Sequence, residues 1–130
     1  MKDSERNPSV LLQENVAAMS LLATRALYDE QPELWKLGEH GRARTLEDFG
    51  HHFRALAALD ERAFEAHVRY CYRLFRARGF PVRWLADAWR HMEPVLGAEL
   101  PVHAAEPAVA LLLKATSRPA LAHGSPTETV

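Results

Sequence analysis

The sequence has one cysteine among its 130 residues, no isoleucine and almost no net charge. A single cysteine excludes an intramolecular disulfide, and we expect a reducing, cytoplasmic compartment. A formal net charge of -1, from 16 basic and 17 acidic residues, argues against a basic nucleic-acid-binding surface and against a polybasic membrane anchor. No run approaches the roughly 18 apolar residues of a membrane-spanning helix. The polar residues 1–8 lack the apolar core of a signal peptide. We therefore expect no nucleic-acid or membrane partner.

The apolar residues that are present recur with a helical period. The alternation of Val, Ile and Thr that is typical of strands is absent, and apolar positions repeat every three or four residues from about Ser9 to Ala115. The sequence therefore predicts an all-α protein of one domain. We expect a flexible N-terminal tail over 1–7, a helical domain over 8–116 and a flexible C-terminal tail over 117–130, since the last segment is rich in Pro, Gly and Ser.

Local signals place the ends of the helices. Ser9 and Thr45 are predicted N-caps, and Thr45 with Asp48 forms a variant of the capping box after a loop over 38–43. Asp60 is predicted to cap a helix that ends at Gly79. Proline late in the next helix should end or kink it. The predicted helices are Ser9–Tyr28, Thr45–Ala58, Glu61–Arg78, one opening at Phe80-Pro81 and carrying Pro94, and Ala104–Ala115, with a short turn at Pro32–Leu37.

The helix at Thr45 carries a crowded polar face. Arg44, Asp48 and His51 share this face by their i, i+3 and i+4 spacing. His52 lies between this face and the apolar stripe, and Arg54 follows His51 by three residues. Carboxylate, imidazole and guanidinium groups beside phenylalanines suit a planar ligand with carboxylates and ring N–H groups. The alternative is a capped helix end whose polar side chains are solvated.

Other chemistry has little support in the sequence. No two of the seven histidines have the i, i+4 spacing of a zinc helix motif, and there is no second cysteine, so we expect no metal site. Cys71 lies on an apolar stripe and is expected to be an inert, buried side chain. There is no Gly-rich phosphate loop and no serine elbow, and we expect no catalytic residues and no enzyme activity.

One segment resembles a known family. The run from Arg42 to Arg54, RARTLEDFGHHFR, resembles the chromophore segment of phycobiliproteins. In that pattern a small residue, Cys, Leu, Arg and Asp are followed, after four further residues, by Leu-Arg. Leu46, Asp48 and Arg54 match it. The likeness continues through Asp60 and the Gly79-Phe80-Pro81 turn, and it covers roughly residues 40–115.

The sequence departs from the phycobiliprotein pattern at two positions. Thr45 stands where the family has the cysteine that holds the bilin, so covalent attachment at this place is excluded, and Glu47 replaces the arginine beside the aspartate. The chain is thus similar to the bilin biosynthesis-associated globins, which lack the anchoring cysteine. The resemblance implies a globin-like fold and non-covalent bilin binding, or an accessory role beside bilin-synthesis enzymes. It implies Asp48 as the partner of pyrrole nitrogens. The hypothetical bilin-binding residues are Arg44, Asp48, His51, His52 and Arg54.

Two other readings stay open. A cofactor-free, globin-like sensory module would form a homodimer through apolar helix faces, involving the first helix and Trp84. A haem-binding globin would need a proximal histidine in a pocket, with His51, His52 and His67 as candidates. We place haem last because no histidine lies squarely on an apolar stripe of the sequence.

Overall fold

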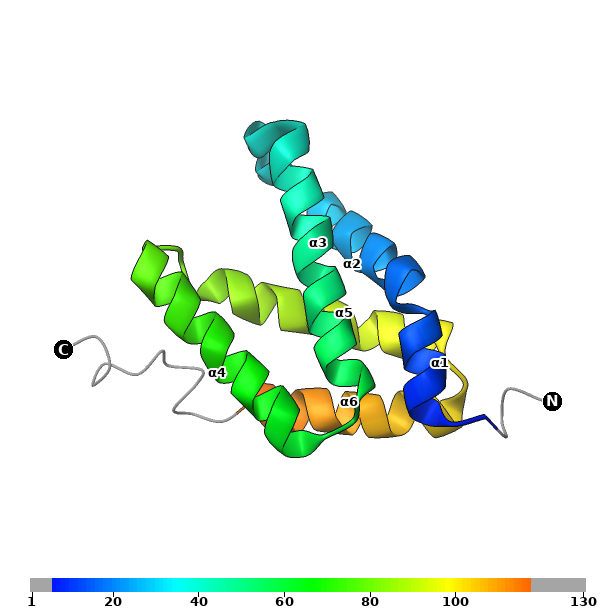
Figure 1. The fold of residues 1–130 in the computed structure, drawn as a ribbon. Coiled ribbons are helices and arrows are strands. Elements are labelled where there is room, and N and C mark those ends of the chain that lie inside the picture. Colours follow the sequence, from blue (N-terminus) through cyan, green and yellow to red (C-terminus); the bar gives the residue numbers. More distant parts are fainter. Residues whose placement is uncertain (1–5, 118–130) are drawn as a thin grey trace.

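The computed structural model describes residues 6–117, and this part of the chain is all-α, as predicted. Within it there are six α-helices, one 3-10 helix and no strand (Figure 1). The predicted tails 1–7 and 117–130 lie almost wholly outside the described residues. The elements are α1 (Pro8–Glu14), α2 (Val16–Glu30), η2 (Pro32–Leu37), α3 (Gly38–Ala57), α4 (Glu61–Arg78), α5 (Arg83–Glu99) and α6 (Val102–Thr116).

The predicted first helix is two helices, because the chain breaks at Asn15 between α1 and α2. Its predicted N-cap is also wrong by two residues. Asn7 is the cap, since its side-chain oxygen accepts hydrogen bonds from the backbone N–H groups of Ser9 and Val10. The Ser9 hydroxyl instead donates to the carbonyl of Ala57 at 2.5 Å, which ties α1 to the end of α3.

The predicted helix start at Thr45 is wrong, because α3 begins at Gly38 and runs without a loop to Ala57. Gly38 has φ 72°, a left-handed conformation that glycine adopts without strain, and it turns the chain from η2 into α3. Thr45 therefore lies inside the helix and caps nothing. Its hydroxyl donates to the carbonyl of Gly41 at 3.0 Å and lies 3.2 Å from the Tyr28 hydroxyl. Bonding back to the preceding turn lets threonine remain in a helix.

The later helices follow the sequence signals more closely. The Asp60 side chain accepts from the N–H of Ala63 at the start of α4, and Gly79 ends that helix with φ 73°, both as predicted. The sequence predicted that Pro94 would end or kink its helix. Pro94 lies inside α5 and does not end it. Proline removes one hydrogen bond of the ladder, and the packed apolar face of α5 holds the helix through that point.

Helices α3 and α4 form a V that opens away from their connection at residues 58–60 (Figure 1). The connection turns at Leu59, whose φ of 54° costs about 1–2 kcal/mol for a residue with a Cβ. Leu59 also packs against the core, which offsets this cost. Helix α2 packs on α3 and α5, and α6 packs on α5 and α4. Among the described residues, no helix combines the length and apolar character needed to cross a membrane.

Candidate functional site

The residues predicted to bind a ligand do not converge on one place. Arg44, Asp48 and His51 lie on the surface of α3, as predicted from their spacing. His52 is buried in the core, and Arg54 lies beside a groove next to α1 and α2. The structure therefore keeps three of the five residues on one face, buries His52, and joins Arg54 to that face only through His51.

Asp48 is the central residue of this face. Its carboxylate lies 3.7 Å from the Arg44 guanidinium, a distance too long for a hydrogen bond, and 44% of its side chain is exposed. Partial burial raises the pKa of Asp48, and this effect outweighs the opposite effects of Arg44 and His51. The carboxylate also contributes to the raised pKa of Cys71 on α4. Asp48 is an acceptor with little hydrogen bonding of its own.

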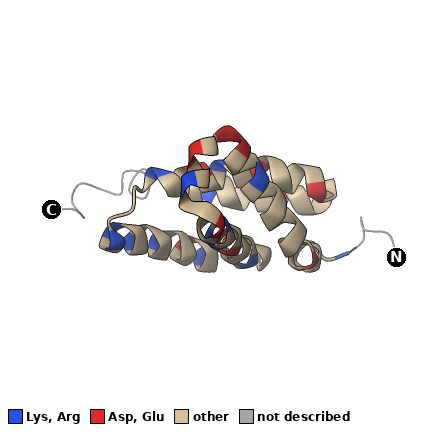
Figure 2. Cartoon of the chain, turned by 90° about the horizontal axis from the view of Figure 1, so that it is seen from above, with Lys and Arg blue, Asp and Glu red and all other residues tan. Residues whose placement is uncertain are grey.

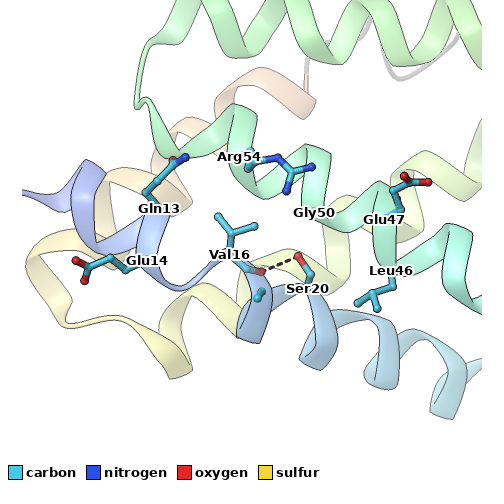
Figure 3. Close-up of a pocket in the computed structure, with 9 residues that line it drawn as sticks. Gln13, Glu14, Val16, Ser20, Leu46, Glu47, Gly50 and Arg54 are labelled. Carbon is cyan, nitrogen blue, oxygen red and sulfur yellow. Dashed lines mark hydrogen bonds between the residues drawn. The ribbon is translucent and has the colours of Figure 1, made fainter.

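Arg54 serves a different surface from Asp48. Its guanidinium lies 3.2 Å from the His51 ring and passes over Gly50, which has no side chain. From there it lines an open groove of about 470 Å³ between α3 and the first two helices (Figure 3). Figure 3 shows that Ser20, in this groove, donates its hydroxyl hydrogen to the Val16 carbonyl, at 2.7 Å. The groove is lined by Gln13, Glu14, Val16, Ala17, Ser20, Leu46, Glu47, Gly50 and Arg54.

His52 belongs to the core, although the sequence placed it beside the polar face and no histidine squarely on an apolar stripe. Only 6% of the residue is exposed, and its ring lies 4.6 Å from the ring of Trp89. Burial lowers the pKa of His52 to about 3, so the imidazole is neutral at physiological pH. The pattern misplaced His52 because the rings of His67 from α4 and Trp89 from α5 pack on it, which the spacing within α3 does not show.

The buried imidazole of His52 meets two donor atoms from α4. His52 Nδ1 lies 2.9 Å from His67 Nε2, and His67 Nε2 lies 3.6 Å from Cys71 Sγ. The three atoms all lie within 4.8 Å of one another, and His52 and Cys71 are buried. We call His52, His67 and Cys71 the histidine–cysteine cluster. The sequence predicted no metal site because no two histidines have the i, i+4 spacing, whereas the i, i+4 pair on α4 consists of a histidine and a cysteine, His67 and Cys71.

The cluster is enclosed by aromatic rings and holds neutral side chains. Phe64 stacks on His67 with ring centroids 5.9 Å apart, and Trp89 covers His52. Burial lowers the pKa of His67 and raises the pKa of the Cys71 thiol to about 12. Cys71 is therefore protonated at neutral pH and is a poor nucleophile in the free protein. Neutral imidazoles, by contrast, keep a lone pair that is able to bind a ligand.

Comparison with known proteins adds no relative. No protein-family model matches the sequence, and neither a curated protein nor a solved structure matches it. The motif of Leu46, Asp48 and Arg54 is thus the basis of the resemblance to phycobiliproteins, and the globin-like relationship stays a prediction.

Proposed function

We propose that this protein binds a linear tetrapyrrole without a covalent bond and acts in bilin metabolism as a carrier or as an accessory to a bilin-synthesis enzyme. The observation that carries the proposal is the state of Asp48. Its carboxylate is half-buried, its charge acts on Cys71 of α4, and it has no close hydrogen-bond partner on α3. The pyrrole N–H groups of a bilin are donors that such a carboxylate would accept.

The basic side chains beside Asp48 and along α4 suit the rest of such a ligand. A bilin carries propionate groups, and arginine pairs well with carboxylates. Arg44 lies one helical turn before Asp48 and is mostly exposed. Helix α4, the other arm of the V, is strongly basic (Figure 2). Its exposed arginines are Arg62, Arg69, Arg73 and Arg78. Thr45 offers a hydroxyl and no thiol, so the bilin would stay exchangeable, as a carrier requires.

Titration with biliverdin, followed by visible absorption and circular dichroism, tests the proposal. We expect an induced dichroic band for the wild type and about 10-fold to 100-fold weaker binding for Asp48→Asn, because a charge-assisted hydrogen bond contributes about 1.5–3 kcal/mol. Glu47→Gln is the matched control, since it removes the neighbouring negative charge. Equal affinity in Asp48→Asn and Glu47→Gln would contradict the proposal. Haem is tested in parallel, and a Soret band lost in His52→Gln would favour the haem reading instead.

A second candidate function is dimerisation without a ligand, and one surface favours it. Phe80 and Trp84 are 42% and 36% exposed, although both are large and apolar. They form a row with Phe75, in which neighbouring ring centroids lie 5.5 Å and 5.9 Å apart. Exposed aromatic groups of this kind are enriched in protein interfaces. This candidate predicts that Trp84 lies in a two-fold interface.

Sedimentation velocity over a concentration series tests this candidate. A homodimer through the aromatic row should dissociate in Trp84→Glu, because a buried unpaired carboxylate is costly. Val102→Glu is the control, since Val102 is 68% exposed and lies on α6. A wild-type protein that stays monomeric, or a dimer that Trp84→Glu leaves intact, would exclude this interface.

A further inference from the structure

We propose that the histidine–cysteine cluster is a binding site for one zinc ion, held by His52 from α3 and by His67 and Cys71 from α4. The proposal does not require bilin binding, since its three metal ligands include neither Arg44 nor Asp48. Imidazole nitrogen and thiolate sulfur are the donors that zinc prefers in proteins. Two of the three come from adjacent turns of one helix, and the third comes from the facing helix.

Two of the three distances between the donor atoms are close to those of an occupied site, and the third, between His52 and Cys71, is within 4.8 Å. Zinc lies at about 2.0–2.1 Å from nitrogen and about 2.3 Å from sulfur, so two ligands of a tetrahedral ion are roughly 3.3–3.6 Å apart. The separation of His67 Nε2 and Cys71 Sγ is 3.6 Å, which already fits. His52 Nδ1 and His67 Nε2 lie 2.9 Å apart and would need to separate by a few tenths of an ångström. Small rotations of the two rings supply this movement.

Binding of the ion moves protons in a defined way. In the free protein, one of the two facing imidazole nitrogens carries the hydrogen of the bond between the rings. That ring must adopt its other tautomer to offer a lone pair to the ion. The Cys71 thiol gives up its proton to the solvent as the sulfur–zinc bond forms, so about one proton is released for each ion bound. No oxidant or reductant takes part.

Three protein ligands leave one position of a tetrahedral ion for a water molecule. Asp48 stands one turn before His52 on α3, and its carboxylate acts on Cys71 through its charge. That negative charge would stabilise the cation from beyond the direct ligands. His67 is partly exposed, whereas His52 and Cys71 are buried, and the exposed edge of His67 gives the ion its path to the site.

If the histidine–cysteine cluster only stabilised the fold, its three side chains would occupy the same positions. The imidazoles of His52 and His67 satisfy each other by one hydrogen bond, as buried polar groups generally do. Such a pair has no need of a thiol at its edge, and replacing the thiol would change only packing. The contribution of Cys71 to metal affinity therefore separates a zinc site from a structural hydrogen bond.

Titration of the tag-free full chain with Co²⁺ and then Zn²⁺ is the direct test. We expect one Co²⁺ per chain, a near-ultraviolet band from thiolate-to-cobalt charge transfer, and loss of that band when Zn²⁺ displaces cobalt. Calorimetry in two buffers of different ionisation enthalpy should show about one proton released per Zn²⁺. Mg²⁺ should give no response, because it requires oxygen ligands. Absence of the thiolate band in the wild type would overturn the proposal.

Variants give the second part of the test. Cys71→Ser should lose the thiolate band and bind Zn²⁺ about 100-fold or more weakly, since even changes beyond the direct ligands weaken zinc sites by 10-fold to 100-fold. His67→Gln, at a partly exposed position, should also weaken binding even if Cys71→Ser folds poorly. His40→Gln is the control, because His40 is exposed near the start of α3. Equal Zn²⁺ affinity in the wild type and Cys71→Ser would exclude the site.

The same variants keep the two proposals distinguishable. Cys71→Ser should bind biliverdin like the wild type, and Arg44→Gln should bind zinc like the wild type. A protein that binds zinc and no bilin would refute the proposed function alone. One that binds bilin and no zinc would refute the histidine–cysteine cluster as a metal site alone.

Discussion

Two polar clusters lie between helices of this protein, and they differ in how their groups are satisfied. Between α2 and α5, Arg90 pairs with Glu30 at 2.8 and 2.9 Å and with Asp87 at 3.0 Å, near the surface. His91 lies 3.4 Å from the same glutamate. Between α3 and α4, the histidine–cysteine cluster contains no formal charge and is mostly buried. In the first cluster each charged group has a partner of opposite sign, whereas the side chains of the second are neutral.

This difference in charge pairing indicates where a binding site is expected. In the α2–α5 cluster each charged group already has partners of opposite sign, so its role is to join two helices. Such exposed ion pairs add little stability one by one. The α3–α4 cluster instead buries His52 and Cys71 and partly buries His67, and burial disfavours the charged form of each of these side chains. Burial of donors without charge compensation is more typical of a site than of a helix-joining contact.

The largest expected effect is that of removing Trp89, which packs on the histidine–cysteine cluster. Trp89 covers His52 and donates its indole N–H to the Tyr72 hydroxyl at 3.4 Å, and only 5% of the residue is exposed. Trp89→Ala should lower the free energy of unfolding by about 3–5 kcal/mol, since it leaves a large cavity beside the cluster. Urea unfolding followed by far-ultraviolet circular dichroism measures this.

Its control is the next residue on the same helix. Arg90→Ala removes the centre of the α2–α5 cluster, yet it should cost far less than Trp89→Ala, because its ion pairs are exposed to solvent. Comparable losses in the two variants would show that the exposed cluster holds the fold as strongly as the core does. That result would contradict the expected difference in unfolding free energy between the two variants.

The sequence was sufficient where a signal acts within one helix. Asp60 and Gly79 lie at the two ends of α4, as predicted. An N-cap side chain needs only the N–H groups of its own helix, and the left-handed turn at the helix end needs only one glycine. Thr45 shows the limit of the same signals. A threonine followed by acids looks like a helix start, but here its hydroxyl bonds to Gly41 and lies beside Tyr28 of another helix. Only the tertiary packing tells these cases apart.

The candidate site was harder to predict than the fold, since it depends on which helices face each other. The spacing correctly placed Arg44, Asp48 and His51 on one face of α3. It could not show that α4 would bring His67 and Cys71 against His52, because the angle of the V is set by core packing and by the turn at Leu59. The i, i+4 pair on α4 was visible in the sequence, but its third partner was 15 residues away along the chain.

The smallest expected effect is the acid sensitivity of the α2–α5 cluster. The hydrogen bonds from Arg90 lower the pKa of Glu30 to about 2 in the folded protein, from an ordinary value of 4.5. The unfolded chain therefore takes up this proton first, so the stabilising contribution is complete above about pH 4.5 and is lost as the pH falls toward 2. Glu30→Gln should show a shallower loss of unfolding free energy over this range, measured by urea unfolding at several pH values.

Glu33→Gln, on η2, controls for the loss of one negative charge. Some acid sensitivity should persist in Glu30→Gln, because Arg6 lowers the pKa of Glu14 in the same direction. If Glu30→Gln and wild type lose stability in parallel from pH 4.5 to 2, then the pairing of Glu30 with Arg90 does not last in solution, and the α2–α5 cluster is not the charge-paired counterpart of the histidine–cysteine cluster.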